Sequence, residues 1–470
     1  MSRIESLCSV PARVRRRAAG TVACAALLGC AGTPYAAPSA EPRPLGAGFA
    51  AYEAPTAPDT AAAAPSTAPL GPEPTGTIAL PTALALALER SPELASFSWE
   101  VRSREARALQ AGLRPNPELE LEVEDFGGTG ATKGFDGAQS TFLLAQRIET
   151  AGKRPKRRRA AELDAEVATW EYEAARLDVF ASVLKAFVEV LAAQERVALS
   201  EELVRIAESS VEGAKRLVRA GATPQAEQTR AAVEAATASV DLATARRALE
   251  AARAALAASW GGLSPSFGRA EGELGSVAAP PSDSTVRAWL DRNPELARWD
   301  REIARRKAVV ELEDAQRVPD VFAGVGPRYL SETSDSVLVA QLAVPLPIFD
   351  RNQGARAAAR NDLRKAEVER RSLHARLAAG LESAYQELAA RHEEVTRLRE
   401  GILPRAGEAF EQVRNGYVQG LFRNVDVLDA QRRLFELRLR EIEALRAYHE
   451  AKAEVQRLTG TPLAPNPTAP

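Results

Sequence analysis

The chain has 470 residues, of which 63 are acidic and 61 are basic, so its formal net charge of −2 is close to zero. A nucleic-acid binder normally carries a clear basic excess, and this composition argues against that class. Aromatic residues make up only 5% of the chain, which is rich in Ala, Leu, Glu and Arg. Such a composition is typical of long helices packed on one another.

The N-terminus has the pattern of a secretion signal. An arginine-rich segment precedes a short apolar run (18–28), which is too short to span a bilayer. Leu27-Leu28-Gly29-Cys30 follows and resembles the lipobox cut by the lipoprotein signal peptidase. We expect residues 1–29 to be removed and Cys30 to carry a covalent lipid. The alternative is an ordinary signal peptide cut near Ala36.

The next segment, residues 30–78, is rich in Ala and Pro and has no apolar period. It is predicted to be a disordered tether. Residues 462–470 are predicted to be a disordered tail. The three cysteines, Cys8, Cys24 and Cys30, all lie near the N-terminus, so the rest of the chain has no disulfide framework.

Between tether and tail the chain repeats itself, with one copy predicted over 79–278 and the other over 279–461. Five landmarks recur in the same order, about 195 to 202 residues apart. They are Ser91-Pro92-Glu93-Leu94 with Asn293-Pro294-Glu295-Leu296, Pro117 with Pro319, Leu144-Ala145-Gln146 with Val339-Ala340-Gln341, Gly221 with Gly420, and Ser259-Trp260-Gly261 with Leu458-Thr459-Gly460.

Each copy is predicted to begin with a helix (about 79–112 and 284–316) and to continue into two short strands. Residues 118–124 alternate strictly between Glu and an apolar residue, the period of a strand with one apolar and one polar face. The other strands are predicted at 140–148 in the first copy, and at 321–330 and 337–344 in the second. A soluble hairpin packed on a core is the alternative interpretation of these runs.

A very long helix follows the strands in each copy. No proline occurs from Lys156 to Thr223, and apolar residues recur there at spacings of three and four. They are Leu177, Phe180, Leu184, Phe187 and Leu191. A helix of roughly 65 residues is about 100 Å long. The second copy predicts a comparable helix over 354–418 with a kink at Pro404, and Gly221 and Gly420 are predicted to end the long helices before a return helix.

Four strands cannot close a membrane barrel, and unpaired strand edges cannot face lipid. If the strands cross a membrane, several chains must share one barrel, and three chains supply twelve strands. The predicted fold is therefore mainly α, with two tandem repeats that build a trimeric 12-stranded transmembrane β-barrel continued by a long α-helical barrel.

This duplicated layout resembles the TolC family of outer-membrane efflux proteins from about residue 79 to 460. Residues 417–431 are similar to the family's periplasmic tip, and 221–227 are the first-copy counterpart. Three segments are similar to the heavy-metal (CzcC-like) branch, namely 112–117, 146–154 and 345–354. The resemblance implies a passive export duct, for which we expect heavy-metal cations as cargo.

The resemblance also implies the partners. They are two further copies in a homotrimer, a periplasmic adaptor, an inner-membrane RND pump and outer-membrane lipid, with no nucleic acid and no cofactor besides the lipid on Cys30. The location expected is the outer membrane with a long periplasmic extension. Two alternatives remain, a drug or small-molecule duct of the same family, and a periplasmic adaptor or coiled-coil scaffold. An adaptor has one helical hairpin, whereas this chain predicts two.

Candidate functional residues follow from the same comparison. Family aspartates at the positions of Asp426 and Asp429 ring the periplasmic constriction, and Tyr417 matches a tyrosine that holds the closed state. The family's clasp arginine falls where this chain has Phe422. By their chemistry alone, the two aspartates also fit the first turn of a helix, where the dipole favours acids.

The remaining expected sites lie at the two ends of the long helices. The tip residues expected to contact the adaptor are Gly221, Thr223, Gly420 and Leu421. The residues expected to line the barrel lumen, if Leu119, Leu121 and Val123 face lipid, are Glu118, Glu120, Glu122 and Glu124. A basic cluster (153–159) is expected to be a solvated helix start.

No catalytic constellation is present in the sequence, and no enzymatic activity is expected. The histidines, His374, His392 and His449, have no metal-ligand spacing, and the chain's one methionine is Met1. A soft-metal site is therefore not expected.

Overall fold

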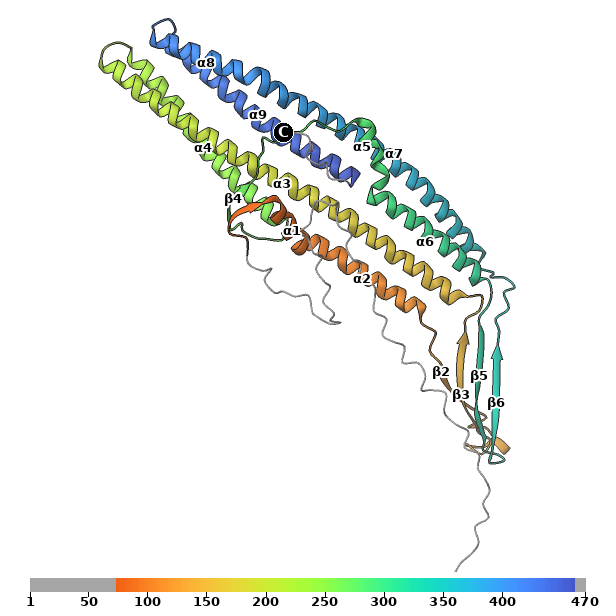
Figure 1. The fold of residues 1–470 in the computed structure, drawn as a ribbon. Helices are drawn as coiled ribbons and strands as arrows, with labels where there is room; N and C mark the ends of the chain where they lie inside the picture. The colour runs from red at the N-terminus through yellow and green to blue at the C-terminus, as the bar shows by residue number, and fades with distance from the viewer. Residues whose placement is uncertain (1–72, 461–470) are drawn as a thin grey trace, which may run out of the picture. The chain divides into compact units, whose positions relative to one another are not determined.

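The computed structural model describes residues 73–460 (Figure 1). The first copy contains β1 (Gly76–Ala79), α1 (Leu80–Arg90), α2 (Pro92–Gly112), β2 (Glu118–Glu124), the short helix η1 (Gly130–Thr132), β3 (Gln139–Ile148), α3 (Lys153–Arg219), α4 (Gln225–Ala258) and β4 (Phe267–Glu271). The second contains α5 (Asp283–Ala288), η2 (Leu290–Arg292), α6 (Pro294–Gln316), β5 (Val321–Leu330), β6 (Asp335–Ala343), α7 (Gln353–Arg397), the π-helix η3 (Leu398–Ile402), α8 (Leu403–Val418) and α9 (Asn424–Thr459). The signal peptide, Cys30, most of the tether and the tail lie outside the described residues.

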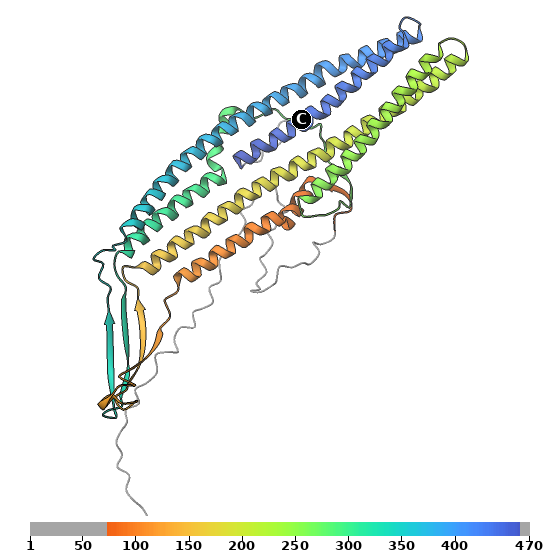
Figure 2. The same ribbon diagram turned by 180° about the vertical axis from the view of Figure 1, so that it is seen from behind.

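The predicted strands are present and form one antiparallel sheet in the order β2-β3-β5-β6. The central ladder joins the two copies, because β3 belongs to the first and β5 to the second. β2 and β6 are therefore the two edges of the sheet. In both views the sheet lies at one end of the long helices, and the helix tips lie at the other end (Figures 1 and 2).

The long helices run side by side. α3 has 67 residues, which corresponds to a length of about 100 Å. It packs against α2, α4, α6 and α9, whereas α7 packs against α6 and α9. Among the residues of the predicted apolar stripe, Leu177, Phe187 and Leu191 are buried, while Phe180 and Leu184 are half-buried. The lengthwise packing predicted from the stripe is confirmed.

Four ion pairs hold α3 to α9 and so join the two copies along their length. They are Arg457–Asp178 at 3.1 Å, Lys185–Glu454 at 2.8 Å, Arg196–Glu443 at 2.6 Å and Arg438–Glu202 at 3.0 Å. A small parallel pair of strands, β1 with β4, lies beside the middle of these helices. Near it, Trp260 and Leu256 are fully buried in the core.

The first helix of each copy differs from its prediction. It is divided in two before a proline, at Ser91 in the first copy and at Asn293 in the second. Proline lacks the N–H that would continue the preceding helix, but it fits the first position of a new helix. The side chains of Ser91 and Asn293 cap the new helices by accepting from the backbone N–H groups of Leu94 and Glu295.

The kink predicted at Pro404 is displaced toward the N-terminus. The irregularity is the π-helix Leu398–Ile402, and Pro404 is the second residue of α8. There a missing N–H leaves no helical bond unmade.

The repeat is confirmed, but one matched landmark is wrong. Glu120 pairs with Leu143 in the first hairpin, and 202 residues on Phe322 pairs with Ala343. The second strands are thus 200 residues apart, so the match of Leu144 with Val339 at 195 was coincidental. An odd offset would also place equivalent residues on opposite faces of the sheet. The second hairpin has longer strands and a shorter loop, 331–334 instead of 125–138.

Within residues 73–460, no helix is both long enough and apolar enough to cross a membrane.

Candidate functional site

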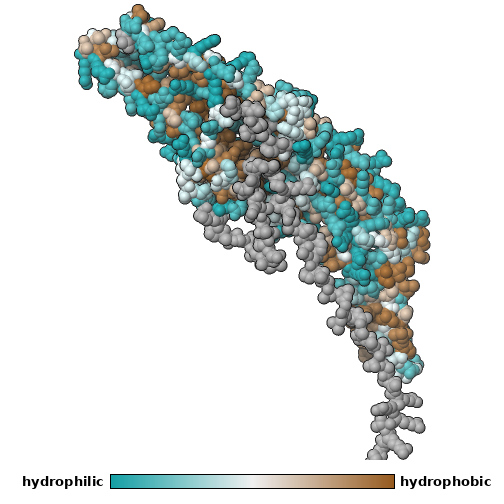
Figure 3. Space-filling model, in the orientation of Figure 1, coloured by the Kyte–Doolittle hydropathy of each residue, from teal (hydrophilic) through white to brown (hydrophobic). Residues whose placement is uncertain are grey.

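The four-stranded sheet has two chemically different faces. The register places one set of large apolar side chains on a single face, and all of them are exposed. They are Leu119, Leu121, Val123, Phe142, Leu144, Ile148, Val325, Tyr329, Leu338 and Leu342. The space-filling view shows hydrophobic residues gathered over this end of the molecule (Figure 3). An exposed apolar surface of this kind marks an interaction site, and a lipid-facing surface fits it.

The opposite face is mainly polar. Glu118, Glu120, Glu122 and Glu124 all lie on it, as their alternation with Leu119, Leu121 and Val123 predicts. It also carries Gln139, Thr141 and Arg328. Leu143 is an apolar exception, buried against the bare backbone of Gly324, where an added Cβ would approach its side chain to 2.8 Å.

Arg328 organises the polar face across three strands. Its Nε donates to Thr141 Oγ1 at 2.8 Å and its Nη1 donates to Gln139 Oε1 at 3.2 Å. Its Nη2 lies 3.3 Å from Glu124 Oε2, so one of the four glutamates is neutralised within the chain. Sequence reasoning missed this residue, although it is the one basic side chain in the strands of the second copy.

A buried ionic cluster joins the sheet to the helices. Asp320, just before β5, accepts from Lys153 Nζ at 2.6 Å and from the Thr150 N–H at 3.1 Å. Arg147 Nη2 lies 2.9 Å from its other oxygen. The side chains of Asp320 and Lys153 are each only 5% exposed. The prediction of a solvated basic cluster is therefore wrong for Lys153, whose partner lies 167 residues away.

The opposite ends of the helices carry two equivalent turns. Gly221 and Gly420 follow α3 and α8 with φ of 70° and 79°, a left-handed conformation that favours glycine. In both turns the next residue donates its N–H to the carbonyl five residues back, from Ala222 to Leu217 and from Leu421 to Gly416. This is the Schellman arrangement. The predicted helix ends at the two glycines are confirmed.

The predicted gate residues lie close to the second turn. Asp426 is the third residue of α9, and its Oδ2 accepts from the backbone N–H of Arg423 at 2.8 Å. This hydrogen bond, together with the Arg423 guanidinium, holds the pKa of Asp426 below its ordinary value. Asp429 is exposed and pairs with Arg432, while Tyr417 is half-buried. Asp426 thus has the helix-start role considered as its alternative, a role that does not conflict with facing a pore.

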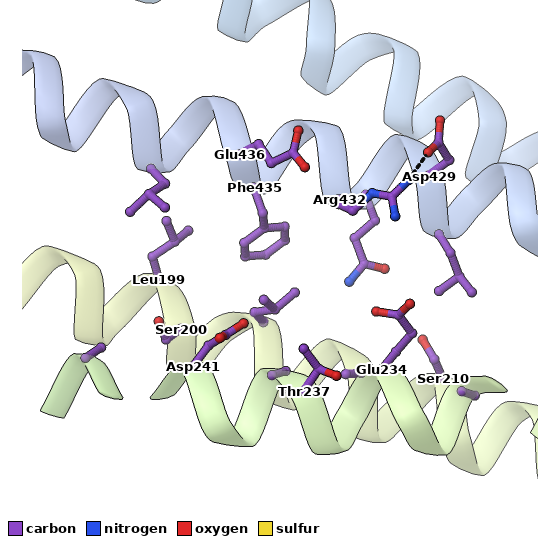
Figure 4. A pocket seen from close by; sticks show the side chains of 18 of the residues that line it. Leu199, Ser200, Ser210, Glu234, Thr237, Asp241, Asp429, Arg432, Phe435 and Glu436 are labelled. Carbon is purple, nitrogen blue, oxygen red and sulfur yellow. Dashed lines mark hydrogen bonds and ion pairs between the residues drawn. The ribbon is translucent and has the colours of Figure 1, made fainter. Parts of the chain in front are cut away.

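The two tips are joined at one point, with a cavity behind it. Asn424 Nδ2 donates to Glu227 Oε2 at 3.3 Å, linking the start of α9 to the start of α4. Between this contact and the Arg438–Glu202 ion pair, a cavity of about 660 Å³ separates α9 from α3 and α4. Figure 4 shows Leu199, Asp241 and Phe435 among its lining side chains.

Candidate metal ligands are not gathered anywhere in the part of the chain described. No group of three or more His, Cys, Asp or Glu side chains is arranged to hold a metal ion within residues 73–460. His449 is buried and its Nε2 lies 2.8 Å from the Leu274 carbonyl oxygen, and burial lowers its pKa. Its position between helices and linker is that of a packing residue.

Comparison with known proteins gives one family and a consistent fold. The family model described as outer membrane efflux protein matches residues 83–262 and 285–461. The chain is 34% identical over 388 residues to the cobalt-zinc-cadmium resistance protein CzcC of Cupriavidus metallidurans, covering 83% of this chain and 91% of that protein.

Solved structures share the fold at low identity. A membrane protein from Pseudomonas aeruginosa superimposes with a TM-score of 0.71 at 17% identity, over 81% of this chain and 92% of that one. CusC gives 0.70 at 16% identity, with the same coverages of 81% and 92%. The outer membrane protein VceC of Vibrio cholerae gives 0.67 at 18% identity, over 82% of this chain and 97% of its own.

Proposed function

The chain belongs to the outer membrane efflux protein family, and from this premise we propose that three copies form one channel that exports heavy-metal cations. The chain is an outer-membrane efflux channel protein, and its long helices extend into the periplasm. The trimer, the cargo, the partners and the roles of single residues are the proposed part.

The two-faced sheet with two unpaired edges is the observation that carries the trimer. β2 and β6 each pair on one side only, and an open edge in lipid leaves backbone groups without hydrogen bonds. Three copies joined edge to edge close twelve strands into a barrel. The apolar face then meets lipid, and Glu118, Glu120, Glu122 and Glu124 line the lumen.

The cargo is supported by the relative and by charge. The relative that is 34% identical is named for cobalt, zinc and cadmium resistance. Carboxylates repeated around a threefold axis attract cations to a pore. The chain supplies a path without catalysis or a cofactor, and selection of the ion belongs to a pump.

The partners follow from the position of the two tips. A periplasmic adaptor contacts the turns at Gly221, Thr223, Gly420 and Leu421, and connects the channel to an inner-membrane RND pump. Asp426, Asp429 and Tyr417 form the periplasmic gate. Outside the described residues, Cys30 carries the lipid that anchors the mature chain beside the barrel.

Two measurements test this function. The membrane-extracted protein is expected to migrate as a trimer on a gel and as a monomer after heating. Deletion of its gene is expected to raise sensitivity to Co²⁺, Zn²⁺ and Cd²⁺ while sensitivity to hydrophobic drugs stays unchanged. A soluble monomer would refute the channel, and sensitivity to drugs but not to metals would assign the small-molecule cargo instead.

A further inference from the structure

The edges of the sheet carry more information than the need for a partner. The chain contains one contact between the second strand of one copy and the first strand of the next, the β3–β5 ladder. From it we infer that β6 of one chain pairs with β2 of a neighbouring chain in one defined register, with Val344 opposite Val123. This inference rests on the proposed trimer and specifies how its subunits join.

The equivalence between the two copies is established inside the structure. First strands differ by 202 residues and second strands by 200, because Glu120–Leu143 and Phe322–Ala343 are equivalent pairs. The start of the long helices gives the same 200-residue offset independently. Gly152 and Asn352 both precede the long helix in a left-handed conformation, with φ of 65° and 57°.

The register between chains then follows by moving each partner to its counterpart. Leu144 pairs with Val325 within the chain. Their counterparts are Val344 and Val123. The pairs Gln146–Ala323 and Ile148–Val321 give two further pairs in the same way. They are Leu346 with Leu121, and Ile348 with Leu119.

This register continues the apolar face across the boundary between subunits. Val344, Leu346 and Ile348 are exposed in the single chain, although they lie beyond the end of β6 at Ala343. Pairing would extend β6 along the whole of β2. A slip of one residue would place the glutamates of β2 opposite these side chains and turn them toward lipid, which the side-chain period of two forbids.

Two prolines next to β6 are compatible with such an extension. Pro327 interrupts the β3–β5 ladder but not the β5–β6 ladder, so the odd-numbered residues of β5 direct their backbone groups toward β3. In β6 the odd-numbered residues then face β5. The N–H groups that Pro345 and Pro347 lack belong on that inner side, where β5 has already ended at Val321. The outer side, which meets the neighbouring chain, keeps the N–H groups of Val344 and Leu346.

Cysteine cross-linking of the full-length protein tests the register. Ala343 and Glu124 are opposite each other in the inferred register, on the polar face, so an Ala343→Cys, Glu124→Cys chain should form covalent dimers and trimers on mild oxidation. Opposite residues in antiparallel strands have Cα atoms about 4.5–5.5 Å apart, within the range that a disulfide bridges.

The matched control is Ala343→Cys with Glu122→Cys, which lies on the same face but two residues out of register. It should cross-link at least tenfold less, because diagonal neighbours are about 7–8 Å apart. Glu122→Cys with Thr141→Cys, opposite each other within one chain, verifies oxidation on this face through loss of free thiols.

The outcomes separate the two proposals. Efficient cross-linking of the control pair, or a heat-sensitive trimer in which neither pair cross-links, would overturn the register and leave the trimeric channel standing. A protein that is monomeric before oxidation would overturn the trimer and the register together.

Discussion

Loss of the Asp320 carboxylate should separate the sheet from the helices that follow it. Asp320 is held by Lys153 at 2.6 Å, by Arg147 at 2.9 Å and by the Thr150 N–H at 3.1 Å. In Asp320→Asn the amide oxygen still accepts one hydrogen bond. The Lys153 ammonium, only 5% exposed, would then have no opposite charge.

The expected cost can be worked from these contacts. Breaking a buried ion pair by removing one partner costs about 3–5 kcal/mol. Arg147 is half exposed and keeps its hydration, so the loss arises from Lys153 and lies near the lower limit. We expect Asp320→Asn to destabilise the protein by about 3 kcal/mol. Replacing both partners, as Asp320→Leu with Lys153→Met, should recover part of it, because no buried charge remains.

The assay is the urea concentration at which the heat-sensitive trimer is lost, read on a gel. The matched control is Asp283→Asn, which breaks the exposed pair with Arg287 and should change stability by less than about 0.5 kcal/mol. If Asp320→Asn behaves like this control, the cluster does not hold the sheet to the helices. If the double variant is no better than Asp320→Asn, the unpaired Lys153 is not the cause.

The remaining predictions concern the anchor, the tips and the gate. Cys30→Ala should abolish labelling by palmitate and leave the trimer intact, whereas continued labelling would place the lipid elsewhere. Gly221→Glu or Gly420→Glu should abolish metal resistance while trimers still reach the outer membrane, because the left-handed φ strains any residue with a side chain; normal resistance in both would exclude the tips as a docking surface. Replacing Asp426 and Asp429 together with Ala should lower cation selectivity in planar bilayers with little effect on folding, since both are exposed surface residues. Unchanged selectivity would leave them as helix-start residues only.

The sequence predicted the strands and long helices because their signals are local. Strict alternation identified Glu118–Glu124, and an uninterrupted apolar period identified the helix ending at Arg219. The proline-divided first helices could have been predicted as well, since Ser91 and Asn293 are good capping residues immediately before a proline. A match of three residues misassigned the second strands, because short apolar runs resemble one another at several offsets.

The ionic contacts could not be predicted from local pattern. Lys153 belongs to a run of basic residues that looks like a solvated surface, and the fold alone brings it to Asp320. Arg328 likewise becomes meaningful only when the register places it beside Glu124. The gate stayed ambiguous for a different reason. A carboxylate at the third position of a helix caps that helix in any protein, so Asp426 carries its helix-start role whether or not it faces a pore.

The duplication gives the two boundaries of each copy different chemistry. Within the chain, Glu454 and Glu443 of α9 form ion pairs with α3. Their first-copy counterparts on α4, 199 residues earlier, are Ala255 and Thr244, which cannot form ion pairs. A neighbouring chain placed against α4 as α3 is placed against α9 would meet small, uncharged side chains at these positions. The helical boundary between subunits therefore depends on packing, and strand pairing between β6 and β2 must supply the directional contacts that fix one subunit against the next.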